Sequence, residues 1–185
     1  MIRQRHQSHR RRSIRLRHYD YTQPGAYFVT VCTQHRECVF GEIVDGKMRL
    51  NDIGRMIYHV WCELPQYYAG INIDEFVVMP NHFHGIIMIV GAGPRARPHA
   101  DAGQPRGVAP TMSLPDVVHR FKSLTTTRYR QGVIQNQWPP FSRKLWQRNY
   151  YERVIRDDAE LNEIRQYVVN NPANWLEDEN YPTRI

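Results

Sequence analysis

The chain has 185 residues and a formal net charge of +7, with 41% hydrophobic, 11% aromatic and 23% charged residues. These are the proportions of one globular domain, so a largely disordered chain is excluded. The longest apolar run, residues 86–90, is far shorter than the roughly 20 residues of a membrane-spanning helix. Met1 is followed by arginines and not by an apolar segment, which predicts no secretory signal. We expect a soluble cytoplasmic protein without a membrane partner.

The cysteine pattern excludes two further classes. Cys32, Cys38 and Cys62 are the three cysteines, and no Cys-x-x-Cys motif occurs. Three thiols cannot all pair, so neither a disulfide scaffold nor a cysteine zinc site is expected.

The positive charge is concentrated at the N-terminus. The first 17 residues hold seven arginines and no acidic residue, and removing these seven leaves the rest of the chain without net charge. Such an arm suits a phosphate backbone, where each arginine can displace a counterion; the alternative is a solvated tail with no function of its own. We divide the chain into a basic disordered arm (1–17), a single domain (18–175) and a C-terminal tail (176–185). The seven are Arg3, Arg5, Arg10, Arg11, Arg12, Arg15 and Arg17.

The first half of the domain predicts three strands, a helix and a hairpin. A β-branched and aromatic strand spans 27–33, and Asp45-Gly46 between short alternating runs indicates a hairpin over 42–50. Apolar residues at helical spacing follow, with Asn51 or Asp52 as cap and Pro65 as the end. Strands are then expected at 73–79 and 82–90, joined by a turn at Pro80-Asn81. The second is apolar on both faces, which predicts a central position in the sheet.

The second half begins with a segment (91–112) rich in Gly, Pro and Ala, which we interpret as a flexible loop inserted into the domain. Ser113-x-x-Asp116 caps a helix, residues 145–155 predict a strand, and Asp157-x-x-Glu160 caps a last helix that ends near Asn171-Pro172.

The element order is therefore strand, helix, strand, strand, helix, strand, helix. This order predicts an α+β fold of the ferredoxin-like split βαβ type, an antiparallel sheet with helices on one face and one additional C-terminal helix.

His82 and His84 are the strongest chemical signal. Alternate residues of a strand project to the same face, so these two imidazoles can share one divalent metal ion while Phe83 points into the packed face. The alternative is two ordinary polar residues at the exposed end of a strand. A metal site usually needs a third protein ligand and an open position for water or substrate.

The last helix offers candidates for that ligand. Tyr167 and Asn171 lie one turn apart on one face, with Glu163 and Glu160 one or two turns earlier on the same side. A half-buried packing role for Tyr167 is the alternative, and the neighbouring Tyr150 and Tyr151 compete with it as reactive tyrosines.

Basic and aromatic residues predict contacts with nucleic acid. The polar side of the 113–130 helix carries Arg120, Lys122, Arg128 and Arg130, beside the arginines of the arm. Aromatic residues near these basic positions can stack on unpaired bases, and core packing is the alternative for each. These aromatic residues are Tyr129, Trp138, Trp146 and Tyr150.

Three segments together resemble the signatures of single-tyrosine HUH transposases. They are MPNHFHG at 79–85, LWQRNYYE at 145–152 and YVVNNP at 167–172, and the opening residues 15–30 also fit the REP-associated tyrosine transposases within that superfamily. The resemblance runs from about Arg15 to Trp175. Each motif is weak alone, whereas their order on a matching pattern of strands and helices is fairly specific.

The resemblance implies a mechanism. His82 and His84 become the metal-binding pair, Tyr167 the nucleophile and Asn171 the third ligand of Mg²⁺ or Mn²⁺. The metal polarises a scissile phosphate, and Tyr167 attacks to give a 5′-phosphotyrosine and a free 3′-hydroxyl. The family acts on single-stranded DNA beside imperfect hairpins, as monomers or homodimers, so the expected partner is single-stranded or hairpin DNA at the bacterial nucleoid.

The residues also set conditions on this mechanism. A tyrosine of ordinary pKa is about 0.1% ionised at neutral pH, and no base is evident from the sequence. The neutral set of two imidazoles and an amide would hold Mg²⁺ or Mn²⁺ weakly, and Glu163 is a candidate for added charge. Three alternatives stay open: a domesticated non-catalytic nucleic-acid-binding protein, a rolling-circle type nickase, and an unrelated metal phosphoesterase.

Overall fold

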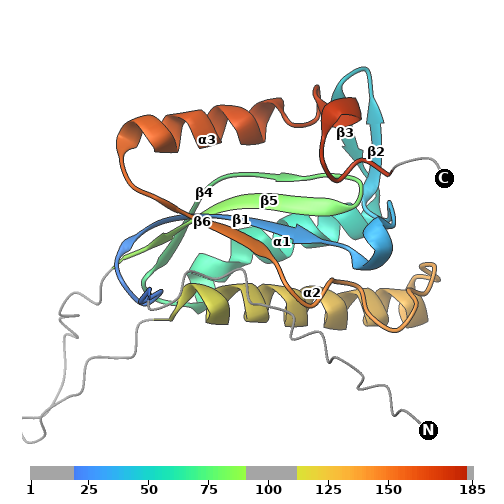
Figure 1. The fold of residues 1–185 in the computed structure, drawn as a ribbon. Helices are drawn as coiled ribbons and strands as arrows, with labels where there is room; N and C mark the ends of the chain where they lie inside the picture. The colour runs from blue at the N-terminus through green and yellow to red at the C-terminus, as the bar shows by residue number, and fades with distance from the viewer. Residues whose placement is uncertain (1–18, 91–111, 183–185) are drawn as a thin grey trace, which may run out of the picture.

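The computed structural model describes residues 19–90 and 112–182 (Figure 1). The predicted basic arm with its arginines and nearly all of the predicted inserted loop lie outside these residues, as do residues 183–185.

The elements follow the predicted order. The strands are β1 (Gly25–Cys32), β2 (Gly41–Val44), β3 (Lys47–Leu50), β4 (Ile71–Val78), β5 (His82–Ile89) and β6 (Tyr151–Ile155). The helices are α1 (Asp52–Tyr67), α2 (Leu114–Gln135) and α3 (Asp158–Asn170), with short 3-10 helices η1 (Gln34–Arg36) and η2 (Trp175–Glu177). No helix among the described residues has the length and apolar character needed to span a membrane.

The main sheet has the strand order β4-β5-β1-β6, and every neighbouring pair is antiparallel. This arrangement confirms the predicted ferredoxin-like fold. β5 lies between β4 and β1, as its two apolar faces predicted. The hairpin β2-β3 forms a separate two-stranded sheet, and its turn residues Asp45 and Gly46 both have positive φ, 51° and 70°.

Helices cover both faces of the main sheet. Figure 1 shows α1 and α2 together on one face and α3 on the other. The larger core lies on the α1–α2 side, where Trp61 of α1, Phe83 of β5 and Phe121 of α2 pack their rings together. The smaller core lies under α3, where Val168 and Ile164 pack on Phe28 and Ile86. The C-terminal helix is therefore anchored to the face opposite the main core.

An ion pair adds to the attachment of α3. The Arg165 guanidinium of α3 donates to both carboxylate oxygens of Asp74 in β4, at 2.9 and 2.6 Å. A two-bond pair of this kind restricts rotation as well as distance. The helix begins where predicted, because the Asp157 carboxylate accepts a hydrogen bond from the Glu160 amide.

Two predicted boundaries were wrong. The strand predicted over 145–155 is confined to 151–155 because the Lys122 ammonium draws the carbonyls of Gln147 and Asn149, at 3.0 and 3.1 Å, away from a neighbouring strand. Between residues 145 and 150 the described chain forms one isolated β-bridge, from Trp146 to Thr33. Pro65 does not end α1, which continues to Tyr67.

We expect Gly54→Ala to destabilise the fold by about 1–3 kcal/mol, the usual cost of overpacking. A Cβ atom at Gly54 would lie 2.1 Å from the Phe40 carbonyl oxygen, so α1 would have to move away from the chain that precedes β2. Urea denaturation measures the change. Gly25→Ala is the matched control, because the atoms nearest to its added Cβ are 3.8 Å away; equal stability of both variants would contradict the prediction.

Candidate active site

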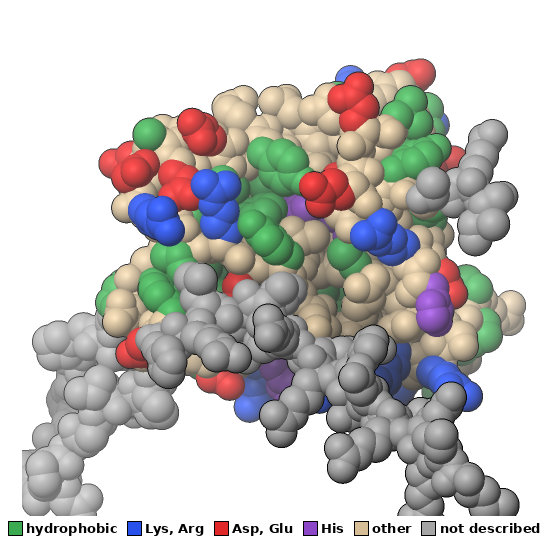
Figure 2. Space-filling view, viewed as in Figure 1, with side chains coloured by type: hydrophobic (Ala, Val, Ile, Leu, Met, Phe, Trp, Pro, Cys, Tyr) green, Lys and Arg blue, Asp and Glu red, His purple; other side chains and the backbone are tan. Residues whose placement is uncertain are grey.

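His82 and His84 meet on the α3 side of the sheet. Their Nε2 atoms are 3.0 Å apart, and both side chains are buried. Phe83 points to the opposite face and into the main core, as the strand alternation predicted. Figure 2, viewed from the edge of the sheet, shows histidine atoms set back between hydrophobic and acidic side chains in the upper part of the molecule. The pair is therefore a buried cluster and not the exposed end of a strand.

Each imidazole is oriented through its Nδ1 atom. Asn81 donates its amide hydrogens to the carbonyls of Arg36 and Asn180, so its Oδ1 accepts the hydrogen of His82 Nδ1 at 2.8 Å. The Nε2 atom of His82 is then left with a free lone pair. Thr30 Oγ1 lies 2.8 Å from His84 Nδ1, and a hydroxyl suits either tautomer because it can donate or accept.

The histidines are held in the neutral form. Burial lowers the pKa of His82 to about 4, against a smaller opposing effect from Asp178. Burial, and then the charge of His82, lower the pKa of His84 well below its ordinary value. Neutral imidazoles are the form that binds a metal ion.

Tyr167 of α3 is the tyrosine at this cluster. Its hydroxyl oxygen is 3.4 Å from His84 Nε2, and 49% of the side chain is exposed. Burial and the negative charges of Asp178 and Glu179 raise its pKa to about 12. The free phenol is thus less acidic than usual, and a nearby cation is needed to favour phenolate.

A carboxylate that the sequence analysis did not select also lies here. Asp178 Oδ2 is 3.8 Å from His82 Nε2 and accepts a 3.0 Å hydrogen bond from Asn171 Nδ2. Asn171 Oδ1 is buried and accepts no hydrogen bond of ordinary geometry. Glu160, by contrast, binds the Arg156 amide and Arg153 at the start of α3.

The segment after α3 is docked by polar contacts beside the site. Arg36 donates to the Glu179 carbonyl at 2.7 Å, and Asn81 donates to the Asn180 carbonyl at 2.8 Å. The Asn180 amide donates in turn to the Asp178 carboxylate at 2.6 Å. These bonds aim Asp178 at the histidines. The acidic run at 177–179 follows the last helix without periodicity, so no pattern in the sequence pointed to it.

The chemistry of this donor set fits a divalent metal ion. The free lone pair of His82 Nε2 faces His84 Nε2 at 3.0 Å, so it can accept a hydrogen bond from one tautomer of His84 or share a cation with it. Among the described residues, His82, His84 and Asp178 offer ligand atoms within 4.8 Å of one another, and the unsatisfied Asn171 Oδ1 adds a neutral oxygen. Mixed imidazole, carboxylate and amide ligands are suited to ions such as Mn²⁺.

Several other predicted binding residues serve internal contacts. Arg128 makes a two-bond ion pair with Glu63, Lys122 holds the loop before β6, and Arg130 lies over the Phe141 ring. Arg120 is exposed on α2. Tyr129 and Trp146 belong to the core, while Trp138 and Tyr150 pack partly buried against it.

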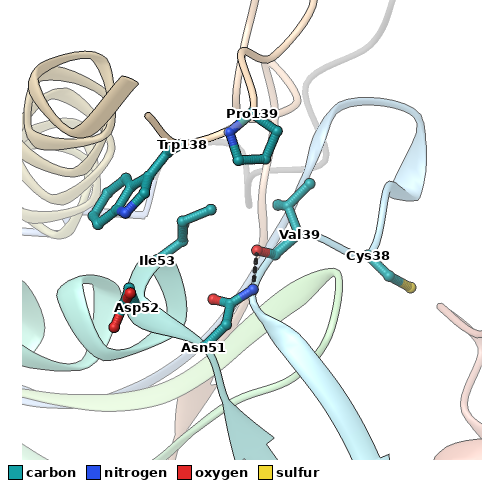
Figure 3. Close-up of a pocket in the computed structure, with 7 residues that line it drawn as sticks. All are labelled: Cys38, Val39, Asn51, Asp52, Ile53, Trp138 and Pro139. Atoms are coloured by element: carbon teal, nitrogen blue, oxygen red, sulfur yellow. Dashed lines mark hydrogen bonds between the residues drawn. The ribbon is translucent and has the colours of Figure 1, made fainter. Parts of the chain in front are cut away.

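A separate pocket lies beside the start of α1 (Figure 3). Its polar side chain Asn51 is already used, because Nδ2 donates to the Val39 carbonyl and Oδ1 accepts from the Gly54 amide. The pocket contains none of the residues around the His82–His84 pair. It is lined by Cys38, Val39, Asn51, Asp52, Ile53, Trp138 and Pro139.

Comparison with solved structures agrees with the fold. A solved structure described as a REP-associated tyrosine transposase bound to a REP hairpin has a TM-score of 0.57 and 18% identity, covering 87% of this chain and 73% of that one. It shows the same α+β fold. A Deinococcus radiodurans crystal structure has a TM-score of 0.45 and 18% identity, covering 84% and 95%.

Sequence similarity gives the family. The family model "Transposase IS200 like" matches residues 107–171, which include α2, β6, α3 and Tyr167. An uncharacterised protein of Haemophilus influenzae is 39% identical over 176 residues, 94% of each chain. The chain belongs to the family of IS200-like transposases.

We expect the unfolding free energy of the metal-free protein to fall as the pH is lowered from 6.5 towards about 4. The folded histidines resist protonation because burial lowers their pKa, so the unfolded chain binds more protons in this window. Stability is therefore complete above the unfolded pKa and is lost by up to about 1.4 kcal/mol per pH unit for each histidine. Urea denaturation across this range measures it. His82→Gln/His84→Gln should give a flatter curve, and an equal slope would contradict the prediction.

We expect Asp178→Asn to weaken Mn²⁺ binding about tenfold or more, because it removes the one negative charge of the cluster. Titration calorimetry with MnCl₂ on the full chain measures the affinity. Glu177→Gln is the matched control, since Glu177 is an exposed neighbouring acid. Unchanged affinity in Asp178→Asn would show that this carboxylate is not a ligand.

Proposed function

We propose that the protein is a metal-dependent transposase that cleaves and rejoins single-stranded DNA through a 5′-phosphotyrosine on Tyr167. The observation that carries this proposal is the position of the Tyr167 hydroxyl, 3.4 Å from one member of a buried histidine pair. Membership in a transposase family supports it. The bond energy kept in a covalent intermediate suits strand transfer without a nucleotide cofactor.

His82, His84 and Asn171, with Asp178 in addition, are proposed to hold Mg²⁺ or Mn²⁺. The bound ion would supply Lewis-acid polarisation of the scissile phosphate. Asn81 and Thr30 keep the two imidazoles in place, and neutrality of the imidazoles leaves their lone pairs available. Asp178 supplies the negative charge that two imidazoles and an amide lack.

In the proposed reaction, the new bond forms at the hydroxyl oxygen of Tyr167. Its oxygen forms a bond to phosphorus while the bond from phosphorus to the 3′ oxygen breaks, which leaves a 5′-phosphotyrosine and a 3′-hydroxyl. The phenol proton leaves, and the departing 3′ oxygen takes up a proton. Attack by a 3′-hydroxyl on the phosphotyrosine reverses these changes and returns the proton to Tyr167. With a pKa raised to about 12, Tyr167 needs positive charge close by to react as phenolate.

The proposed DNA substrate is a single strand next to a hairpin-forming repeat. The solved structure of similar fold is described as bound to a REP hairpin, which supports this choice. Arg120 on α2 and the arm arginines Arg10, Arg11, Arg12, Arg15 and Arg17 are proposed to contact phosphates. Lys122, Arg128 and Arg130 are proposed to do so in addition to their internal contacts. We place the protein at the bacterial nucleoid, as a monomer or homodimer.

The test is capture of the covalent intermediate. A labelled pool of single-stranded hairpins with varied flanks is incubated with the protein and Mn²⁺ and separated on a denaturing gel. We expect a labelled protein band that is absent with Tyr167→Phe and absent without metal. Tyr151→Phe is the matched control, because Tyr151 is the other exposed tyrosine on this face, and it should keep the band.

Other outcomes point to other functions. A band that persists in Tyr167→Phe and disappears in Tyr151→Phe moves the nucleophile to Tyr151. Tight binding without metal and without any band, unaffected by Tyr167→Phe, would replace the proposal with a non-catalytic DNA-binding protein. Strand cleavage without a protein-linked product would indicate a metal phosphoesterase.

A further inference from the structure

Three neighbouring strands carry one row of side chains on the active-site face. His84 of β5 pairs with Thr30 of β1, and Thr30 pairs with Tyr151 of β6. Directly paired residues of antiparallel strands project to the same face, about 4.5–5.5 Å apart. Tyr151 therefore lies on the face of the metal-binding pair, two strands from His84.

The Tyr151 ring is held at this position but is open to a partner. It makes an edge-to-face contact with Phe28 at 6.4 Å, and Phe28 in turn contacts His84 at 5.3 Å and Tyr167 at 5.9 Å. Tyr151 is exposed over about half of its surface, 52%. Phe28 itself is buried, so Tyr151 and Tyr167 are the rings of this group that DNA can reach.

The Tyr151 ring is also linked to Tyr167 by packing. Phe28 contacts both rings, Tyr151 at 6.4 Å and Tyr167 at 5.9 Å between ring centroids. A strand whose phosphate lies at Tyr167 must continue to either side of it. The exposed tyrosine on the neighbouring edge strand is then within reach of a base next to that phosphate.

We propose that Tyr151 is a stacking site for an unpaired base next to the scissile phosphate, an inference that rests on the proposed function. An aromatic ring binds any unpaired base through its π face, whereas a paired base in a duplex is not available. The site would select single-stranded DNA at the position of cleavage and would hold the phosphate in register with Tyr167. It acts on DNA directly and is separate from the metal ligands.

The binding test uses Tyr167→Phe protein, which cannot form the covalent bond, with Mn²⁺ and fluorescent dT20. Adding Tyr151→Ala should raise the Kd about 5- to 100-fold, the range that base stacking on one aromatic residue gives. Tyr151→Phe should stay within about twofold of the parent, because it keeps the ring. Tyr67→Ala is the matched control; Tyr67 is 68% exposed and belongs to α1, on the opposite face.

A second measurement locates the base. In the strand that Tyr167 captures, single abasic nucleotides are placed on either side of the cleaved phosphate. One position should weaken binding in the Tyr167→Phe background and have no further effect once Tyr151→Ala is present. An unchanged Kd in Tyr151→Ala, or equal losses in Tyr151→Phe and Tyr151→Ala, would overturn the stacking site.

The two proposals fail in different ways. If no covalent band forms but Tyr151→Ala still weakens dT20 binding while Tyr151→Phe does not, the cleavage mechanism is wrong and the stacking surface stands. If the band forms normally and Tyr151→Ala binds and reacts like the parent, the stacking site alone is wrong. Melting temperatures within about 2 °C of the parent establish that the variants are folded.

Discussion

The close approach of two buried imidazoles, whose Nε2 atoms are 3.0 Å apart, is the constraint on which this structure depends. A buried ring nitrogen needs a hydrogen-bond partner or a cation, so each ring has to be held in a fixed orientation. Asn81 and Thr30 hold the outer nitrogens of both rings. The sheet places the histidines on one face, and Asn81 closes the arrangement because it bonds to His82, Arg36 and Asn180 together. Such rigidity is expected where a positive ion belongs between the rings.

Tyr167 and the histidines have separate supports. The histidines belong to a central strand, whereas Tyr167 is on a helix attached through a small apolar cluster and the Arg165–Asp74 pair. Packing on both sides makes the strand the stiffer of the two. The helix has fewer attachments, so small shifts of α3 would change the distance from Tyr167 to the histidine pair.

The sequence predicted the fold and the placement of about half of the candidate site's residues because both are encoded locally. Strand alternation put His82 and His84 on one face and Phe83 in the core, and helical spacing put Tyr167 and Asn171 one turn apart. Asp178 and Asn81 could not be assigned roles in this way. Their positions depend on contacts between segments 45 to 99 residues apart, such as Asn81 with Arg36 and with Asn180. The prediction of a strand from residue 145 was wrong for the same reason, because Lys122 of α2, a distant element, donates to the carbonyl groups of this segment.

The position of Asp178 has a consequence for synthesis of the chain. Residues that gather at the metal-binding pair come from β1, β5, α3 and finally the segment after η2. A nascent chain can fold its sheet once β6 has emerged, yet it cannot complete the charged cluster until residue 178 has left the ribosome. Under the proposed function, the cluster that would hold the metal ion is complete only when translation has passed the whole domain, so unfinished chains lack its carboxylate.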